Sequence, residues 1–252
     1  MPTRILGVIP ARFASSRFPG KALSSLAGKP ILQHVYERAS AARYLTRLVV
    51  ATDDERIERA ARGFGAPVVM TRSDHLSGTD RAAEVASTDP SEIIVNIQGD
   101  EPLIDPAAID AAVLGLLDDP NVPMGTLKKK IDDPAEVANP NVVKVVTNHA
   151  GEAIYFSRSP IPFARGGDQP HTRVVWYKHI GLYVYRRPLL LAYSDLPVGP
   201  LEQAEKLEQL RALENGYSIR VIETEYESLG VDTPEDLEKV SQLFQSSSLS
   251  HG

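Results

Sequence analysis

The 252-residue chain contains no cysteine. This absence excludes disulfide bonds, thiolate metal sites and thiol nucleophiles. Long apolar runs are missing too, since no stretch approaches the ~18 consecutive apolar residues of a membrane-spanning helix. The apolar run within the N-terminal MPTRILGVIPAR is too short for the core of a signal peptide. We therefore expect a cytoplasmic protein that has no membrane partner.

An excess of positive charge is also missing. The chain has 27 Lys and Arg residues against 33 Asp and Glu residues, a formal net charge of −6. A nucleic-acid-binding protein normally carries a broad basic surface, so the composition argues against that class. It does not argue against a nucleotide, because a few cations focused in a cleft can hold phosphates on an acidic protein.

The first 130 residues alternate apolar strand patterns with helical patterns. Strands are predicted at 4–10, 47–53, 66–71 and 92–102, and helices at 30–43, 54–65, 79–87 and 106–119. This order predicts an α/β fold with a mostly parallel sheet and helices on both faces. Ligands bind such sheets at the carboxyl ends of the strands. We therefore expect the loops at 10–21, 71–79 and 98–102 to share one rim.

From about residue 131 the pattern changes to antiparallel or mixed strands. Further strands are predicted at 142–148, 152–158, 177–187 and 218–224, and helices at 200–216 and 233–245. The segment TLKKKI at 126–131 has three consecutive lysines, so we expect a solvent-facing edge strand protected by charge. We expect the tail at 246–252 to be disordered.

The loop IPARFASSRFPGK at 9–21 is the first candidate for chemistry. It places Arg12, Arg17 and Lys21 among small residues directly after the first strand. Small residues let backbone N–H groups approach an anion, and the cations can neutralise a polyphosphate. It is neither a P-loop nor a Rossmann fingerprint. The alternative is a solvated loop with scattered basic residues.

Two carboxylates are candidates for a metal site. Asp100 lies just past the end of a buried strand, where a carboxylate can reach the cleft and hold a hard cation. A simple turn would also explain the segment around it. Asp232 precedes a predicted helix that Thr233 and Asp236 are placed to cap. Capping is therefore the alternative role for Asp232 as well.

Eight segments in order resemble the 3-deoxy-manno-octulosonate cytidylyltransferase family, also called CMP-KDO synthetases. They are IPARFASSRFPGK (9–21), MTRSDHLSGTDR (70–81), VNIQGDEP (95–102), NPNVVKVV (139–146), YFSRSPIP (155–162), KHIGLYVYR (178–186), PLEQAEKLEQLR (200–211) and GVDTPEDLE (230–238). The resemblance runs from residue 5 to about 245. The first loop alone would be weak, because related cytidylyltransferases share its outline.

The resemblance implies a reaction and an architecture. The anomeric hydroxyl of 3-deoxy-D-manno-octulosonate (KDO) would attack the α-phosphorus of CTP, giving CMP-KDO for lipopolysaccharide biosynthesis and pyrophosphate, with Mg²⁺ required. The implied fold is of the nucleotide-diphospho-sugar-transferase type, with a smaller mixed β lobe that forms a homodimer. We expect one domain over 1–245: a nucleotide-binding part at about 1–130, a sugar-binding and dimerisation part at about 131–225, and a metal-ligand segment at 226–245.

The family's site residues carry over to matching positions. Arg12 and Lys21 would be catalytic residues that hold the triphosphate, with help from Arg17, and Asp100 and Asp232 would hold Mg²⁺. The positions that match the cytosine and ribose region are Ala11, Thr71, Arg72, Ser77, Gly78 and Gln98. The KDO side would use Gln98, Arg158, His179, Tyr183, Glu208 and Gln209, with Arg158 as the bidentate partner of the sugar carboxylate.

Several alternatives stay open at this stage. His179 and Tyr183 are also compatible with structural roles, and Glu208 and Gln209 with a solvated helix face. Asp80 stands where the family often has Glu, which is harmless if it caps a helix or faces solvent. For the whole chain, the alternatives are a cytidylyltransferase for another acidic sugar (8-amino-KDO or sialic acid), a glycosyltransferase, and a non-catalytic nucleotide sensor. GDEP lacks the acid-x-acid metal signature usual in glycosyltransferases.

Overall fold

Nine strands form one continuous sheet in the computed structural model, which describes residues 3–14, 18–165 and 174–249. The strands of the sheet are β1 (Ile5–Pro10), β4 (Arg47–Thr52), β5 (Val68–Met70), β6 (Ile93–Asn96), β7 (Met124–Lys130), β8 (Lys144–Thr147), β9 (Ala153–Ser157), β10 (Tyr177–Arg186) and β11 (Ile219–Glu223). Their order is β11-β7-β10-β6-β1-β4-β5, with β8 pairing with β10 and β9. A separate hairpin joins β2 (Ser25–Leu26) to β3 (Lys29–Pro30).

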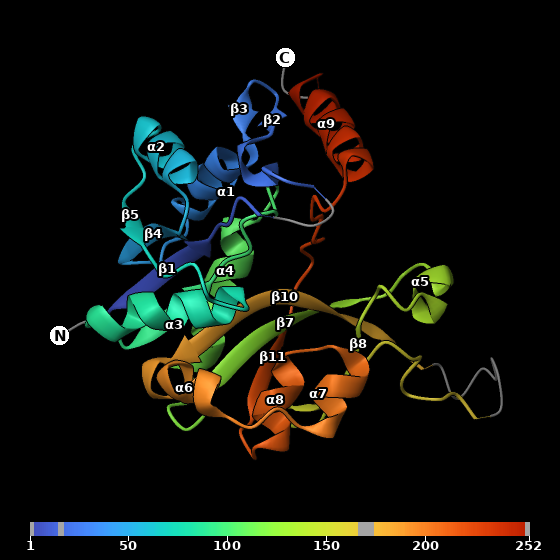
Figure 1. Ribbon diagram of the computed structural model, residues 1–252. Helices are drawn as coiled ribbons and strands as arrows, with labels where there is room; N and C mark the ends of the chain where they lie inside the picture. The colour runs from blue at the N-terminus through green and yellow to red at the C-terminus, as the bar shows by residue number, and fades with distance from the viewer. Residues whose placement is uncertain (1–2, 15–17, 166–173, 250–252) are drawn as a thin grey trace.

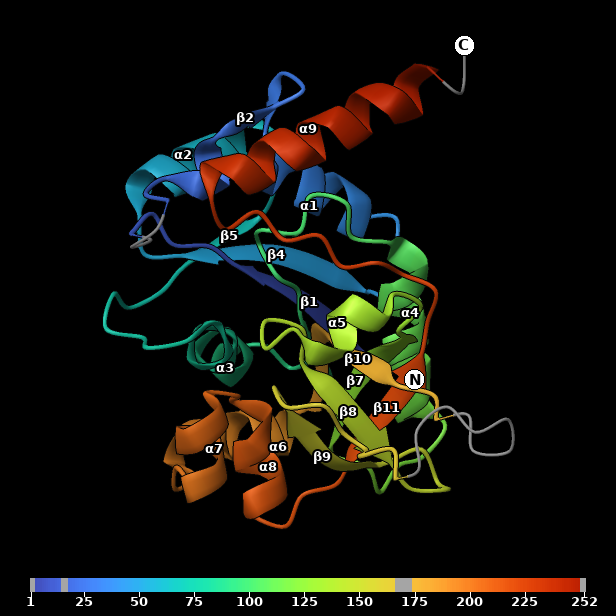
Figure 2. The ribbon, with the colours of Figure 1, turned by 90° about the vertical axis from the view of Figure 1, so that its right-hand side faces the viewer.

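Helices cover both faces of this sheet (Figures 1 and 2). They are α1 (Ile31–Ala39), α2 (Glu55–Gly63), α3 (Gly78–Thr88), α4 (Pro106–Leu117), α5 (Pro134–Ala138), α6 (Arg187–Ala192), α7 (Pro200–Glu205), α8 (Gln209–Glu214) and α9 (Pro234–Leu249), with 3₁₀ turns η1 (Lys21–Leu23) and η2 (Tyr193–Asp195). Among the residues that the structure describes, no helix is long and apolar enough to cross a membrane.

The N-terminal half of the sheet is parallel. β1 lies between β4 and β6, and β5 extends the series beyond β4. Alternate residues of β1 face opposite sides: Ile5 and Ile9 join the core under α1, α2 and α4, whereas Leu6 and Val8 join the core under α3. This confirms the predicted α/β fold, a mostly parallel sheet with helices on both faces.

The other half of the sheet is mixed, and β10 joins the two halves. This ten-residue strand is antiparallel to β6 on one side and to β7 on the other. Its odd-numbered residues, including Tyr183 and Tyr185, pack with α6 and α8, whereas Ile180, Leu182 and Val184 face the core under α4. Because the strand is shared, the second part of the chain is a continuation of one sheet.

The prediction of an edge strand at 126–131 is wrong. β7 lies inside the sheet, hydrogen-bonded to β10 and to the late strand β11. Two of the lysines are accommodated because their ammonium groups reach partners outside β7. Lys129 Nζ lies 2.9 Å from a Glu227 carboxylate oxygen, and Lys128 Nζ donates to Thr147 Oγ1 (3.1 Å). Three lysines in a row indicated an edge, but the pairing strand comes from far along the chain.

Two further boundaries need correction. The predicted helix at 200–216 is broken into α7 and α8, because Lys206 adopts a left-handed conformation (φ 54°) that ends α7 and lets Leu207 turn into the core. The closing helix α9 runs to Leu249, so residues 246–249 are helical where the sequence predicted a disordered tail. Residues 250–252 of that tail lie outside the described residues.

Candidate active site

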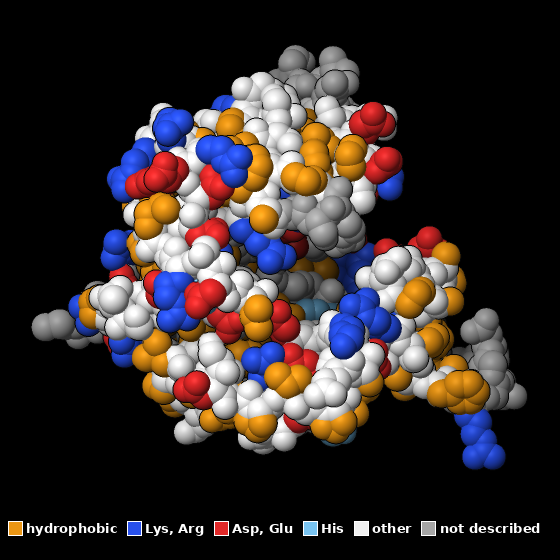
Figure 3. Space-filling model, in the orientation of Figure 1, with side chains coloured by type: hydrophobic (Ala, Val, Ile, Leu, Met, Phe, Trp, Pro, Cys, Tyr) orange, Lys and Arg blue, Asp and Glu red, His pale blue; other side chains and the backbone are white. Residues whose placement is uncertain are grey.

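A cavity of ≈ 270 Å³ opens at the carboxyl edge of the parallel strands. Figure 3 shows the surface hollowed in this region, with Lys, Arg, Asp and Glu side chains around the hollow. The lining residues are Pro10, Ala11, Arg12, Lys21, Ala22, His75, Ser77, Gly78, Arg81, Gln98, Gly99, Asp100 and Asp232. They include members of all three loops predicted to share a rim, so that prediction is confirmed.

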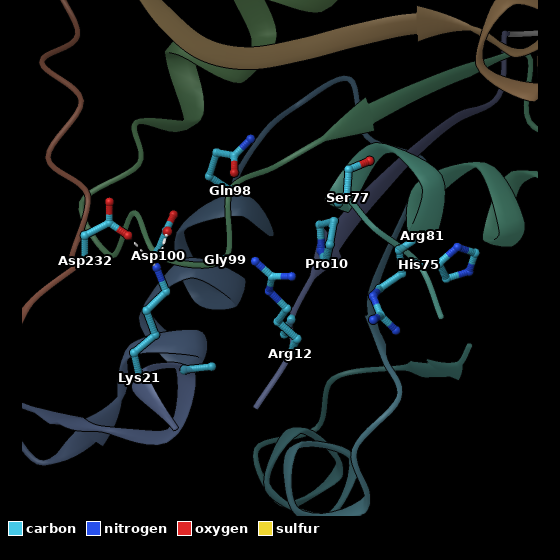
Figure 4. Close-up of a pocket in the computed structure, with 13 residues that line it drawn as sticks. Pro10, Arg12, Lys21, His75, Ser77, Arg81, Gln98, Gly99, Asp100 and Asp232 are labelled. Carbon is cyan, nitrogen blue, oxygen red and sulfur yellow. Dashed lines mark hydrogen bonds and ion pairs between the residues drawn. The ribbon is translucent and has the colours of Figure 1, made fainter. Parts of the chain in front are cut away.

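The first loop is anchored away from the cavity. The N–H of Gly20 donates to the carbonyl of Phe13 (2.9 Å), with Gly20 in the left-handed region at φ 74°. The guanidinium of Arg56, on α2, lies 3.3 Å from the centre of the Phe13 ring. These contacts hold the loop while Arg12 stands within the cavity, between the carboxylates and the start of α3 (Figure 4). Arg17 lies outside the described residues.

Lys21 joins the two candidate metal ligands. Its Nζ lies 2.6 Å from Asp100 Oδ2 and 2.9 Å from Asp232 Oδ1, as the dashed lines in Figure 4 show. Burial by itself lowers the pKa of Lys21, but the charges and hydrogen bonds of Asp100 and Asp232 outweigh it and raise that pKa. Lys21 is therefore an ammonium ion that bridges two carboxylates.

Backbone packing brings these carboxylates together. A Cβ on Gly99 would lie 2.7 Å from the carbonyl oxygen of Pro10, so a larger residue could not approach the first loop this closely. The N–H of Val231 donates to the carbonyl of Asp100 (2.9 Å), which fixes the segment that carries Asp232.

Helix capping at α9 falls to other residues than Asp232. The N–H of Asp236 donates to Thr233 Oγ1 (3.2 Å), and the N–H of Thr233 donates to Asp236 Oδ2 (3.1 Å). The predicted capping by Thr233 and Asp236 is therefore confirmed. Since Thr233 serves the helix, the Asp232 carboxylate is directed toward Lys21 instead.

The opposite wall is the N-terminus of α3. Ser77 and Asp80 form a capping box, with the N–H of Asp80 donating to Ser77 Oγ (3.1 Å), so of the two roles considered for Asp80 the structure shows helix capping. One turn further, Arg81 is only 4% exposed and lies 3.1 Å from Asp53. His75 is held by a close contact with Glu84. The helix N-terminus and the Arg81 guanidinium favour an anion in the cavity.

Sequence reasoning missed part of this wall and floor. The lining residues that it did not name are Pro10, Ala22, His75, Arg81 and Gly99. Arg81 could have been found, because it lies in the first turn of the predicted helix at 79–87, shortly after Ser77 and Gly78. Two predicted residues are not among those that line the cavity: Thr71 accepts a hydrogen bond from Arg81, and the exposed Arg72 pairs with Asp74 at 2.9 Å.

Four of the predicted sugar-side residues form one connected group next to the cavity. Tyr183 Oη donates to Gln209 Oε1 (3.1 Å), and the rings of His179 and Tyr183 are 5.5 Å apart. Thr79 Oγ1, on α3, donates to a Glu208 carboxylate oxygen (3.2 Å). These residues do not line the nucleotide-side cavity.

Gln98 connects this group to the cavity. It lines the cavity, and its Nε2 donates to the carbonyl of Gly181 on β10 (3.1 Å). Within the group, shielding from water lowers the pKa of His179 to about 3. The ring is therefore neutral near pH 7, and its Nε2 pairs with Thr126 Oγ1 (2.9 Å).

Arg158 stands apart from this group. Its Nε donates to the carbonyl of Glu205 (2.7 Å) and one terminal nitrogen to the carbonyl of Pro140 (3.0 Å). The other terminal nitrogen lies 3.5 Å from the carbonyl of Lys206. The guanidinium thus pairs with the carbonyl of Pro140 and with carbonyls at the end of α7. Arg158 does not line the cavity.

The donor set suits a hard divalent cation shared with a nucleotide. Within the described ranges, no group of three or more His, Cys, Asp or Glu side chains is arranged to hold a metal ion. Asp100 and Asp232 nevertheless converge on one cation, the ammonium of Lys21, which marks a place where positive charge is stabilised. Mg²⁺ is usually held by one or two carboxylates together with substrate phosphates, which fits this pair.

Comparison with known proteins defines the class. The family of cytidylyltransferases matches residues 6–225. At the level of fold, the chain superposes on 4-diphosphocytidyl-2C-methyl-D-erythritol synthase from Anaerococcus prevotii with a TM-score of 0.63 at 14% identity, covering 97% of this chain and 100% of that one. The cavity at the carboxyl edge of a parallel sheet is thus that of a nucleotidyltransferase-type α/β protein.

Relatives of high sequence identity give the particular family. The chain is 70% identical to the 3-deoxy-manno-octulosonate cytidylyltransferase of Solibacter usitatus, over 99% of this chain and 98% of that protein. It is 60% identical to that of Geobacter sulfurreducens, over 96% and 99%. A solved structure of CMP:2-keto-3-deoxy-manno-octonic acid synthetase complexed with CTP has 47% identity and a TM-score of 0.93, covering 97% and 100%. The chain belongs to the 3-deoxy-manno-octulosonate cytidylyltransferase family of cytidylyltransferases.

Proposed function

We propose that this enzyme transfers the CMP moiety of CTP to the anomeric hydroxyl of KDO. The observation that carries the proposal is the cavity in which Arg12, Lys21 and Arg81 face the paired carboxylates of Asp100 and Asp232. Cations and a helix N-terminus fit a triphosphate, and the carboxylates fit the cation that accompanies it. The full-length relatives that carry the name of this activity supply the identity of the sugar.

The reaction needs positioning and charge neutralisation more than covalent help from the protein. The anomeric oxygen of KDO forms a bond to the α-phosphorus, and the bond from that phosphorus to the bridging oxygen breaks. Pyrophosphate leaves with the electron pair, and the hydroxyl proton is released to water. Arg12 and Lys21 hold the triphosphate and neutralise the charge that develops on the phosphoryl and leaving groups.

Asp100 and Asp232 are the residues that would hold Mg²⁺. The bound ion would stabilise the negative charge on the α-phosphate oxygens and would lower the pKa of the sugar hydroxyl. The ion would bind the same two carboxylates that now pair with Lys21. The ammonium of Lys21 would then pair with the phosphates of CTP instead. Arg12, which stands free of the carboxylate pair, would contact the phosphates directly.

KDO would bind along the face of β10. Neutral His179, Tyr183 and Gln209 offer hydrogen-bonding groups for sugar hydroxyls, and Gln98 links this face to the nucleotide side. Arg158 would pair with the sugar carboxylate after exchanging at least one of its backbone carbonyl partners. A charge-assisted bidentate pair is strong enough to favour such an exchange.

We also propose a cytoplasmic homodimer that activates KDO for lipopolysaccharide biosynthesis. CTP is a cytoplasmic substrate, and the second half of the chain exposes large apolar side chains that an interface would cover. Phe163 is 86% exposed and Ile154 61% exposed. Sedimentation equilibrium of the wild-type chain and of a Phe163→Ser, Ile154→Ser variant tests this: the wild type should sediment as a dimer and the variant as a monomer.

The test of the main proposal is pyrophosphate release with CTP, KDO and Mg²⁺. Release should require KDO, should be stronger with CTP than with ATP, GTP or UTP, and should stop when EDTA removes the metal. Faster turnover with sialic acid or 8-amino-KDO would change the assigned sugar. Binding of CTP without pyrophosphate release from any sugar acid would contradict the catalytic proposal.

A further inference from the structure

The segment that carries Asp232 has no regular secondary structure of its own. Residues 224–233, here called the strap, connect β11 to α9 without forming a helix or strand. Figure 2 shows this strap running from β11 past α4 toward α9. Because an irregular segment has no continuous ladder of backbone hydrogen bonds, its position along the core depends on individual contacts, including those of its side chains.

Glu101, the residue next to Asp100, makes two of those contacts. Its side chain is buried (7% exposed) and both carboxylate oxygens accept hydrogen bonds from the strap. Tyr226 Oη donates to Oε2 (2.8 Å), and Ser228 Oγ donates to Oε1 (2.7 Å). A buried carboxylate is costly unless hydrogen bonds satisfy it, so these two bonds strongly favour one register of the strap.

The intervening residue fixes the strap from the opposite side. Glu227 points away from Glu101 and pairs with Lys129 (2.9 Å) and Lys178. Alternation of Tyr226, Glu227 and Ser228 is the pattern of an extended chain. Lys129, in the lysine run of β7, thus helps to hold the strap in place.

Beyond these contacts the strap meets Asp100 itself. The N–H of Val231, which is fully buried, donates to the Asp100 carbonyl. Glu101 therefore binds the strap at Tyr226, and Asp100 binds it at Val231, the residue directly before Asp232. A shift of the strap by one residue would break all three bonds and would move Asp232 away from Asp100.

We propose that Glu101 is a positioning residue that sets the register of the strap and thereby the spacing of the Asp100 and Asp232 carboxylates. This inference rests on the proposed function, since it assumes that these carboxylates hold the divalent cation. Glu101 does not line the cavity, so it acts through the strap and contacts neither nucleotide nor sugar. Residues that orient metal ligands affect metal affinity strongly.

The test compares Glu101→Ala with the near-isosteric Glu101→Gln. Mn²⁺ binding is measured by electron paramagnetic resonance in the presence of α,β-methylene-CTP, and binding of that analogue without metal is measured by calorimetry. We expect Glu101→Ala to weaken Mn²⁺ binding by about 10-fold or more. Metal-free binding of the analogue should change by less than about 2-fold, and Glu101→Gln, which keeps a partner for each hydroxyl, should restore Mn²⁺ affinity to within about 3-fold.

Two further variants keep the result interpretable. Tyr226→Phe removes only one hydroxyl and should weaken Mn²⁺ binding by a smaller factor, even if Glu101→Ala fails to fold. Glu225→Ala changes an exposed strap residue and should leave Mn²⁺ affinity unaltered. Unchanged Mn²⁺ affinity in folded Glu101→Ala, or equal loss of nucleotide and metal binding, would overturn the proposal. If Asp100→Asn and Asp232→Asn both leave Mn²⁺ binding intact, the metal site itself is wrong, which is a different failure.

Discussion

The two regions that we propose to bind the substrates differ in how their polar side chains are satisfied. At the carboxyl edge of the parallel strands, ions face one another across a cavity, with Lys21 between Asp100 and Asp232. On the face of β10, polar groups are paired with neutral protein groups, as Tyr183 is with Gln209. Glu208 and Arg158 are the titratable members of this region, and they pair with the Thr79 hydroxyl and with backbone carbonyls.

This difference indicates how each region can exchange its partners for a substrate. The nucleotide side holds charges whose present partners resemble the proposed ligands. The Lys21 ammonium lies between the two carboxylates where a metal ion would bind, and Arg12 and Arg81 are cations that suit phosphates. On the sugar side, a ligand must compete with hydrogen bonds that are already made. We therefore expect electrostatic substitutions to affect the nucleotide side most, and sugar-side substitutions to act mainly on KDO affinity.

The largest effect should come from the carboxylate pair. Asp100→Asn and Asp232→Asn should each lower turnover by at least ~100-fold, as expected when a metal ligand or transition-state contact is lost. Pyrophosphate release at saturating CTP, KDO and Mg²⁺ measures this. Asp133→Asn alters a helix-capping carboxylate on α5, outside the cavity, and serves as the control. A near-wild-type rate for either variant would remove that residue from the site.

The shared rim of this region could be predicted from sequence. Apolar strand patterns showed that each of the three loops follows a strand. Because the carboxyl ends of parallel strands lie at the same edge of a sheet, the three loops were expected to meet there. The joint contact of Lys21 with Asp100 and Asp232 could not be predicted, because the position of Asp232 depends on the path of the strap. Nothing in GVDTPED indicates that Val231 pairs with the carbonyl of Asp100. The resemblance supplied the pair of carboxylates, but not the lysine between them.

Charge patterns were the least reliable guide. The lysines of TLKKKI indicated an edge, yet β11 pairs with that strand and Lys129 reaches Glu227. The sequence indicates no more than a turn for Glu101, although GDEP places this residue directly after the candidate metal ligand Asp100. In both cases the role of the residue depends on partners that are distant in the sequence. A single sequence does not indicate which distant side chain lies next to it in the fold. The helix predicted at 79–87, in contrast, placed Arg81 in its first turn, close to the candidate residues Ser77 and Gly78.

The second prediction concerns Arg158. If it exchanges backbone carbonyls for the KDO carboxylate, Arg158→Ala should raise the KM for KDO by about 10-fold or more and leave the KM for CTP nearly unchanged. Steady-state kinetics with each substrate varied in turn measures the split. Arg62→Ala, on the far helix α2, is the control. A lower melting temperature with both KM values unchanged would restrict Arg158 to holding the end of α7.

The third prediction tests whether Lys21 competes with the metal. Lys21→Met removes the ammonium but keeps most of the side-chain volume, so free Mn²⁺ should bind the nucleotide-free protein more tightly, by up to about 5-fold for a partly exposed ion pair. Turnover should fall in the same variant, because the triphosphate loses a cation. Calorimetric titration with Mn²⁺ alone gives the affinity. Weaker Mn²⁺ binding in the variant would show that Lys21 supports the metal site instead of competing for it.

The smallest effect concerns His179 and stability. The folded-state pKa is depressed to about 3, so between that value and the unfolded pKa of about 6.5 the unfolded chain binds the extra proton. Stability from this residue is thus present above about pH 6.5 and is lost as the pH falls. Between about pH 7 and pH 6, wild type should lose about 0.7 kcal/mol more unfolding free energy than His179→Gln.

Urea unfolding at each pH measures this difference. The difference between the two proteins should be constant between about pH 7.5 and pH 8.5, where the imidazole is neutral in both states. A constant difference down to about pH 6 as well would mean that the ring accepts its proton in the folded protein. His179 would then be a cation on the β10 face, and this region would share the ionic character of the nucleotide side.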